Sequence, residues 1–181
     1  MKSGESNDKV ALITGGARSG KSRHAIKLAQ SRYRGGRAFF IATAQPLDEE
    51  MAERIRRHRA SRPDCFETVE EPLEVSAKLE RLGAIADVTV IDCLTLWLSN
   101  LLLFAKASDE AVVREATKLA EALRSAPCFT VVVSSEVGSG IVPENPLARR
   151  FRDLLGEVNQ RIAAASDRVI LMVAGYPVQV K

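Results

Sequence analysis

A glycine-rich segment near the start of the chain has the residue types and spacing of a phosphate-binding loop. Residues 15–22 read GGARSGKS, which fits the pattern G-x-x-x-x-G-K-[ST]. The apolar run Val10–Thr14 enters this segment and a helical pattern leaves it. Glycines let backbone N–H groups turn toward phosphate oxygens, and the N-terminus of a helix adds positive partial charge. This context favours a P-loop over a glycine-rich turn that matches by chance.

The P-loop predicts a role for each of two polar side chains. Lys21 should reach the β- and γ-phosphates of a nucleotide, and the Ser22 hydroxyl should bind Mg²⁺. Asp92, at the end of the apolar run 88–92, is the candidate for a second metal ligand. A helix N-cap or a strand-end carboxylate is the structural alternative for Asp92, and the two interpretations are compatible. The nucleotide contacts expected from the loop are Gly15, Gly16, Ala17, Arg18, Ser19, Gly20, Lys21 and Ser22.

A histidine among arginines is the second candidate for chemistry. Met51, Ile55, His58 and Arg62 fall on one face of an expected helix that would point inward. An imidazole can attack a phosphorus centre, and neighbouring arginines suit the charge that develops on phosphate oxygens. A partly buried structural histidine explains the same spacing, so the residues permit a nucleophile without requiring one. The other histidine, His24, is explained by packing or a local polar contact.

Composition and missing motifs exclude several classes of protein. The excess of 26 Lys and Arg over 23 Asp and Glu is too small to indicate nucleic acid as the main partner. Three scattered cysteines without a CxxC pair argue against a zinc site and favour a reducing cytoplasm. The N-K-x-D motif of regulatory GTPases and the L-S-G-G-Q motif of transporter ATPases are absent. These absences favour small kinases and transferases.

The elements that must position these residues alternate along the chain. Short apolar runs suggest strands, and the longer amphipathic segments between them suggest helices, which together indicate an α/β fold with a mainly parallel sheet flanked by helices. The most apolar region, residues 88–105, reads as a buried strand and a helix rather than a membrane span. We expect a flexible N-terminus over residues 1–9 and one domain over 10–181. The expected strands are 10–14, 38–43, 88–92, 129–134 and 169–174, with a short one at 178–180, and the expected helices are 21–33, 47–59, 73–82, 94–105, 109–124 and 145–165.

Further segments beside the P-loop resemble one enzyme family closely. It is the bifunctional adenosylcobinamide kinase / adenosylcobinamide-phosphate guanylyltransferase family of cobalamin biosynthesis. The resemblance spans Val10 to Lys181 and is most specific in the run 136–145, EVGSGIVPEN. The other matching segments are 14–25, 41–44, 48–51, 54–55, 58–63, 147–149, 151–153 and 158–161.

This resemblance implies a fold, two reactions and a set of site residues. The fold would be a single RecA-like P-loop domain, assembled as a homotrimer. The enzyme would phosphorylate adenosylcobinamide with ATP or GTP, and would then transfer GMP from GTP to the resulting phosphate through a guanylylated histidine. The family motif places that histidine at His58. It also implies nucleotide contacts at Ala42, Thr43, Ala44, Arg59, Ala60, Ser61, Arg62, Glu70 and Asp92.

Two positions depart from the family pattern, and one loop allows two interpretations. Asp92 stands where some relatives carry Glu, and Arg57 stands where some carry a second His. The loop at 136–145 follows an expected strand, so we favour an active-site or subunit-contact role over a simple surface turn. Two rival functions remain for the whole chain: a P-loop small-molecule kinase with a structural His58, and a nucleotide-binding module without turnover.

Overall fold

The computed structural model describes residues 8–181, which form one mainly parallel α/β sheet flanked by helices. The strand order is β3-β2-β4-β5-β1-β6-β7, and every neighbouring pair is parallel except β6 and β7. This arrangement confirms the expected fold class. Residues 1–7 of the expected flexible N-terminus lie outside the described part. The strands are β1 Val10–Gly15, β2 Ala38–Ala42, β3 Phe66–Glu70, β4 Val88–Asp92, β5 Phe129–Val133, β6 Arg168–Val173 and β7 Tyr176–Gln179.

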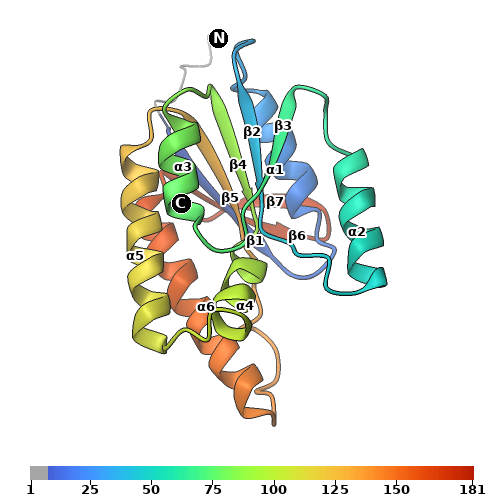
Figure 1. Ribbon diagram of the computed structural model, residues 1–181, viewed down its shortest axis with the longest axis vertical. Coiled ribbons are helices and arrows are strands. Elements are labelled where there is room, and N and C mark those ends of the chain that lie inside the picture. Colours follow the sequence, from blue (N-terminus) through green and yellow to red (C-terminus); the bar gives the residue numbers. More distant parts are fainter. Residues whose placement is uncertain (1–7) are drawn as a thin grey trace.

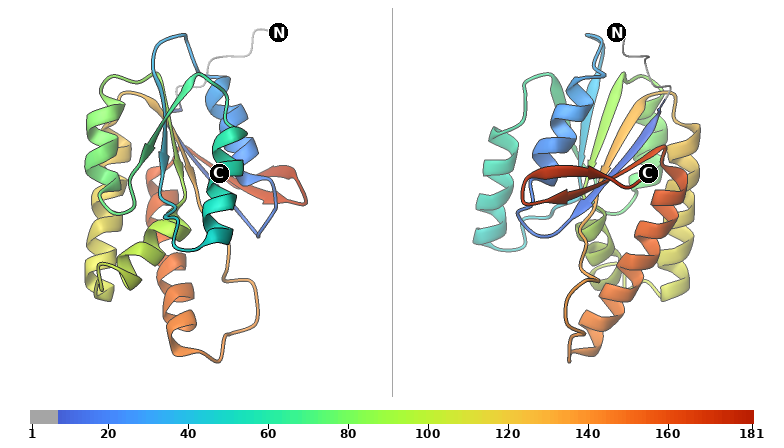
Figure 2. Two further views of the ribbon diagram at one scale, coloured as in Figure 1. Left: turned by 45° about the vertical axis from the view of Figure 1, so that its right-hand side comes forward. Right: turned by 180° about the vertical axis from the view of Figure 1, so that it is seen from behind.

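Helices cover both faces of the sheet (Figures 1 and 2). Val10 and Leu12 of β1 pack on the side that carries α3 to α6, whereas Ala11 and Ile13 pack on the side that carries α1. Alternate residues of a strand point to opposite faces, so β1 is apolar throughout because both faces are covered. The helices are α1 Lys21–Gln30, α2 Glu49–Ala60, α3 Val75–Gly83, α4 Leu94–Leu103, α5 Asp109–Ser125 and α6 Pro146–Ala165.

Helix α2 is the exception to this packing. None of its residues is buried, and it belongs to neither apolar cluster of the core. The Asp48 side chain accepts a hydrogen bond from Met51 N at 2.7 Å, and this cap starts the helix at Glu49 rather than at the expected Leu47. On the face expected to point inward, Met51 and Ile55 are partly buried, whereas His58 is exposed.

The strand β3 was not expected from the sequence. It pairs only with β2, at one edge of the sheet, and Phe66 is its only buried residue. An edge strand with so little burial has a weak apolar pattern, so it resembles a loop in the sequence. The last strand also differs, because Tyr176–Gln179 turns back on β6 in place of the expected 178–180.

The most apolar segment of the chain divides as expected into β4 and α4. Trp97 and Leu98 of α4 are buried in the apolar core. Across residues 8–181, no helix combines the length and the apolarity that a bilayer crossing requires.

Candidate active site

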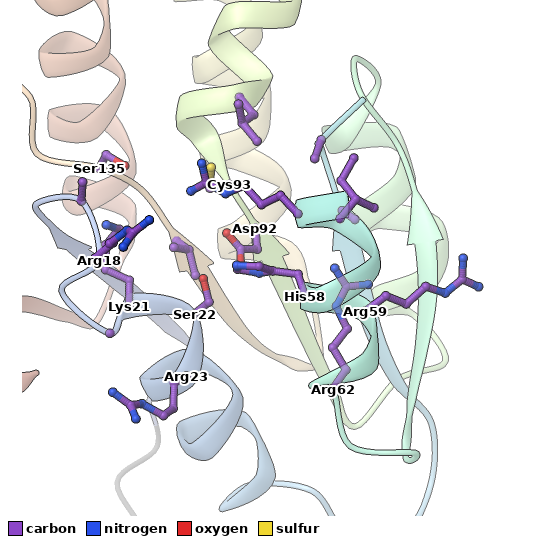
Figure 3. A pocket seen from close by; sticks show the side chains of 18 of the residues that line it. Arg18, Lys21, Ser22, Arg23, His58, Arg59, Arg62, Asp92, Cys93 and Ser135 are labelled. Atoms are coloured by element: carbon purple, nitrogen blue, oxygen red, sulfur yellow. The ribbon is translucent and has the colours of Figure 1, made fainter. Parts of the chain in front are cut away.

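The P-loop, α2 and the carboxyl ends of β4 and β5 surround a cavity of about 420 Å³ (Figure 3). Ligands of open α/β sheets bind at this edge, because the strand ends and the loops that follow them meet there. Six arginine and lysine side chains but only two carboxylates line the cavity, so it favours an anion. The lining residues used below are Arg18, Lys21, Ser22, Arg54, His58, Arg59, Arg62, Glu70 and Asp92.

The P-loop has the backbone shape that its glycines were expected to allow. Gly15 has φ +143°, and a Cβ there would lie 2.5 Å from the Met172 carbonyl oxygen. Gly20, which begins α1, also has positive φ, and no side chain caps this helix. The first turn of α1 therefore offers backbone N–H groups and positive partial charge to a ligand.

Lys21 lies at the base of this loop. Its Nζ donates a hydrogen bond to the Gly16 carbonyl at 2.7 Å, which holds the ammonium group beside the phosphate-binding backbone. The pKa of Lys21 is lowered, chiefly by burial, with a smaller contribution from the positive charge of Arg54 and opposing effects from Cys93 and Asp92.

Ser22 and Asp92 line the same cavity from α1 and β4. The N-cap position of α4 is Cys93, so Asp92 is a strand-end carboxylate and not the helix cap. A hydroxyl and one carboxylate fit Mg²⁺, which usually binds one or two carboxylates together with nucleotide phosphates and water. Residues 8–181 contain no group of three His, Cys, Asp or Glu side chains that could hold a metal without such help.

His58 is exposed and points from α2 into the cavity, toward Asp92 (Figure 3). Its side chain has no hydrogen-bond partner among residues 8–181. The structural alternative from the sequence, a satisfied and partly buried histidine, is therefore wrong. His24 is half-buried on α1 and does not line the cavity, and its pKa is lowered by burial and by Lys27.

Two arginines after His58 connect α2 to the edge of the sheet. Arg59 lies 3.8 Å from the Glu70 carboxylate. The Arg62 guanidinium stacks 3.8 Å from the Phe40 ring centroid and donates to Thr68 Oγ1 at 2.9 Å. Burial lowers the pKa of Arg62, and its buried Nε has no hydrogen-bond partner within the described residues.

The cavity does not include all the residues expected from the sequence. Thr43 is fully buried, and its hydroxyl is hydrogen-bonded to the Cys93 backbone, whereas Ala42 and Ala44 on either side do line the cavity. Gly15, Gly16, Ala60 and Ser61 lie in the adjoining backbone but not in the lining. Lining residues absent from the expected nucleotide contacts are Arg23, Met51, Arg54, Ile55, Cys93, Leu96, Val133 and Ser135. Arg54 could have been found from the sequence, because it precedes His58 by four residues and so lies on the same face of the helix.

The loop 136–145 hangs below this edge of the sheet, beside the N-terminus of α6 (Figure 2). Glu136 N donates to the Gly15 carbonyl at 3.1 Å, which ties the start of the loop to the P-loop. Ile141 is 97% exposed and Val142 is 58% exposed. A second, mainly apolar cavity of about 440 Å³ lies between this loop, α4 and α6.

Comparisons with known proteins identify the family of this chain. The family model described as cobinamide kinase / cobinamide phosphate guanyltransferase, CobU, matches residues 11–180. The bifunctional adenosylcobalamin biosynthesis protein CobU of Escherichia coli K12 is 40% identical over 183 residues, covering 95% of this chain and 99% of the relative. The relative of the same name from Salmonella typhimurium is 42% identical, with the same coverage. The bifunctional adenosylcobalamin biosynthesis protein CobP of Pseudomonas aeruginosa is 45% identical over 170 residues, covering 94% of this chain and 96% of the relative.

The family model and these relatives extend over almost the whole chain, from β1 to the last strand. The matched residues include the P-loop and α2, which form the two sides of the cavity. The chain therefore belongs to the family of cobinamide kinases / cobinamide phosphate guanyltransferases.

Proposed function

We propose that this protein is a bifunctional transferase of adenosylcobalamin biosynthesis. It phosphorylates adenosylcobinamide with ATP or GTP, and then transfers GMP from GTP to adenosylcobinamide phosphate through a guanylylated His58. The observation that carries this proposal is that His58 and the P-loop face each other across one cationic cavity. A kinase alone needs the P-loop, but it gives no reason for an exposed imidazole opposite it.

In the first reaction, the P-loop backbone and Lys21 bind the nucleotide phosphates and neutralise their charge. The hydroxyl oxygen of the cobinamide side chain attacks the γ-phosphorus. The bond from this phosphorus to the β-bridging oxygen breaks, so the nucleoside diphosphate leaves with the electron pair and the hydroxyl proton is released. Positioning by residues 15–22 provides most of the acceleration, because this chemistry needs little else from the protein.

In the second reaction, a ring nitrogen of His58 attacks the α-phosphorus of GTP. The N–P bond forms as the P–O bond to pyrophosphate breaks, and GMP is left on the histidine. A phosphate oxygen of adenosylcobinamide phosphate then attacks the same phosphorus and releases His58. Division into two displacements is the usual advantage of a covalent intermediate.

Mg²⁺ fits the oxygen ligands that face this cavity. Ser22 and Asp92 would hold it together with nucleotide phosphates. When bound, the ion neutralises charge on the phosphates as they separate. Asp92 would also hold Mg²⁺ close to Lys21. The negative charge of Asp92 already acts on Lys21, where it opposes the lowering of the pKa.

The enzyme assembles as a homotrimer, as the family resemblance implies. Ile141 and Val142 in the loop 136–145, with Leu103 and Leu147 beside it, form the exposed apolar surface that we expect a neighbouring copy to cover. Light scattering should give three times the chain mass of 19.7 kDa, and Ile141→Asp should lower that mass. A monomeric wild-type protein would contradict the trimer.

Unpaired Cys65, Cys93 and Cys128 support a reducing, cytoplasmic location.

Labelling of the protein with GTP tests the function. Purified protein with Mg²⁺ is incubated with GTP labelled at the α-phosphate, denatured and examined for acid-labile label on the chain. We expect label from α-labelled GTP, none from γ-labelled GTP, and none in His58→Asn. His24→Asn is the matched control, because His24 does not line the cavity, and it should be labelled like the wild type.

The outcome distinguishes the proposal from its rivals. Absence of label with intact GTP binding would leave a single-activity kinase or a nucleotide-binding module. Phosphorylation of adenosylcobinamide without labelling would indicate the single-activity kinase. GTP binding without phosphorylation or labelling would indicate the nucleotide-binding module.

A further inference from the structure

The arginines of α2 differ in whether a carboxylate neutralises them. Arg56 and Arg57 both pair with Glu53 in their own helix, and Arg59 pairs with Glu70 of β3. Within the described residues, the Arg54 guanidinium forms no ion pair and donates no hydrogen bond. It is also the first arginine of the helix to line the nucleotide cavity, whereas Arg56 and Arg57 do not line it.

Arg54 lines the cavity together with the P-loop lysine. The positive charge of Arg54 lowers the pKa of Lys21, after the larger effect of burial. Two cations that face each other across a cavity repel, and an anion between them removes the repulsion. The triphosphate that Lys21 binds is such an anion.

The position of Arg54 on the helix determines which phosphates it can contact. His58 follows four residues later, so both side chains lie on one face, with Cβ atoms about 5–6 Å apart. A group attached to the His58 imidazole is therefore beside Arg54. Lys21 binds the distal phosphates on the opposite wall. Arg54 thus shares the cavity with both His58 and Lys21, within reach of a triphosphate that extends from one to the other.

We propose that Arg54 is a catalytic residue of guanylyl transfer, which binds the α- and β-phosphate oxygens on either side of the bond that breaks. This inference rests on the proposed function and adds a residue to its second reaction. As the His58–phosphorus bond forms, the bridging oxygen takes the electron pair and leaves with pyrophosphate. The guanidinium neutralises charge on that oxygen and on the α-phosphate.

A guanidinium suits this position better than an ammonium group. Its planar N–H fork can donate two parallel hydrogen bonds to phosphate oxygens, and it stays charged at every accessible pH. A donor directed at charge that develops in the transition state typically contributes about 10²–10³ in rate. In the kinase reaction, the bond that breaks lies beyond the β-phosphate, so we expect Arg54 to contribute less there.

The test compares Arg54→Gln with Arg56→Gln. Both remove one exposed arginine of α2, but Arg56 pairs only with Glu53 and does not line the cavity. The initial rate of labelling with α-labelled GTP should fall about 10²–10³-fold in Arg54→Gln and less than about threefold in Arg56→Gln. Phosphorylation of adenosylcobinamide should fall less than about tenfold in Arg54→Gln.

A second variant and the reverse reaction make the test independent of folding. Arg54→Lys keeps the charge, and its labelling rate should still fall by at least about tenfold, because lysine cannot make the bidentate contact. Added pyrophosphate should remove GMP from the labelled wild-type protein, and Arg54→Gln should slow this reversal as well, because both directions share one transition state.

The results separate this inference from the proposed function. Labelling of Arg54→Gln at a rate within threefold of the wild type would overturn the role of Arg54 and leave the guanylylated His58 intact. An equal loss of labelling and of phosphorylation would also overturn it, since that result indicates a general nucleotide contact. A wild-type protein that binds GTP and takes no label would overturn both the function and this role.

Discussion

The hydroxyl of Thr43 is hydrogen-bonded to both backbone polar groups of Cys93, accepting from N at 2.8 Å and donating to O at 2.8 Å. Thr43 follows β2, and Cys93 follows β4, so this pair joins two adjacent strand ends. Asp92 lies directly beside the pair and lines the nucleotide cavity. The hydroxyl thus fixes the backbone that presents a candidate metal ligand.

Thr43→Val should therefore lower the free energy of unfolding more than it lowers the affinity for GTP. It leaves the Cys93 N–H without its hydrogen-bond partner in a part-buried place, whereas Cys93 O still accepts from Trp97 N, and this loss costs about 1–3 kcal/mol in free energy of unfolding. Urea denaturation measures this loss. The control is Thr117→Val. Thr117 is exposed on α5 and its hydroxyl donates to Val113 O of the same helix, so this change should alter stability by less than about 0.5 kcal/mol. A large loss of GTP affinity at unchanged stability would contradict a purely structural role of this hydroxyl and support the expected nucleotide contact at Thr43.

Lys21→Ala should impair both reactions, because each one uses the phosphates that this side chain binds. We expect kcat/KM to fall about 10²–10³-fold for phosphorylation and for guanylyl transfer. Lys27→Ala removes an exposed lysine from the same helix, outside the cavity, and should leave both rates near the wild-type values. Steady-state kinetics of the two reactions decide the matter, and loss of only one activity would contradict a shared phosphate site.

Cys93 should resist alkylation despite its place in the cavity wall. Burial is the main cause that raises the pKa of its thiol to about 11, and the negative charge of Asp92 adds to the effect. Since the thiolate is the nucleophile, iodoacetamide should modify Cys93 slowly at pH 8 and faster as pH approaches 11. Peptide mass spectrometry can follow Cys93 and the half-buried Cys65 in one sample. Faster modification of Cys93 than of Cys65 at pH 8 would contradict this assignment.

Glu71 should stabilise the start of α3 in a pH-dependent way. Burial alone would raise the pKa of Glu71, but hydrogen bonds from Glu74 N, Leu73 N and Lys78 lower it overall from 4.5. A depressed carboxyl pKa means that the stabilisation is present above pH 4.5 and is lost as pH falls below that value.

Glu71→Gln tests this dependence through the free energy of unfolding. We expect a loss of about 1–2 kcal/mol at pH 7, and a smaller difference from the wild type at pH 4. Glu115→Gln is the control, because its partner Lys118 is largely exposed, and it should cost less than about 1 kcal/mol at either pH. A deficit that grows on acidification would contradict the sign of the pKa shift.

Local sequence patterns were sufficient for the P-loop and most of the sheet. The residue types and spacing of 15–22 are typical of a phosphate-binding loop. The strands β1, β4 and β5 are apolar on both faces because helices cover both faces of the sheet. The family resemblance added the guanyltransferase reaction, which the description of the matching family includes, and a role for His58 that stays a prediction. The boundaries of the elements were less certain, as the Asp48 cap of α2 illustrates.

Only the tertiary structure decided what depends on neighbours distant in sequence. The edge strand β3 exists because β2 offers it a partner, and its own residues give too weak a pattern to show it. The nucleotide contact at Thr43 stays a prediction, but only the fold shows that its hydroxyl is hydrogen-bonded to the Cys93 backbone. Periodicity identified the face of α2 that carries His58, but not that this face borders a cavity instead of the core. Local sequence sets which shapes a segment can adopt, whereas burial, pairing and charge neutralisation are set by residues that only folding brings together.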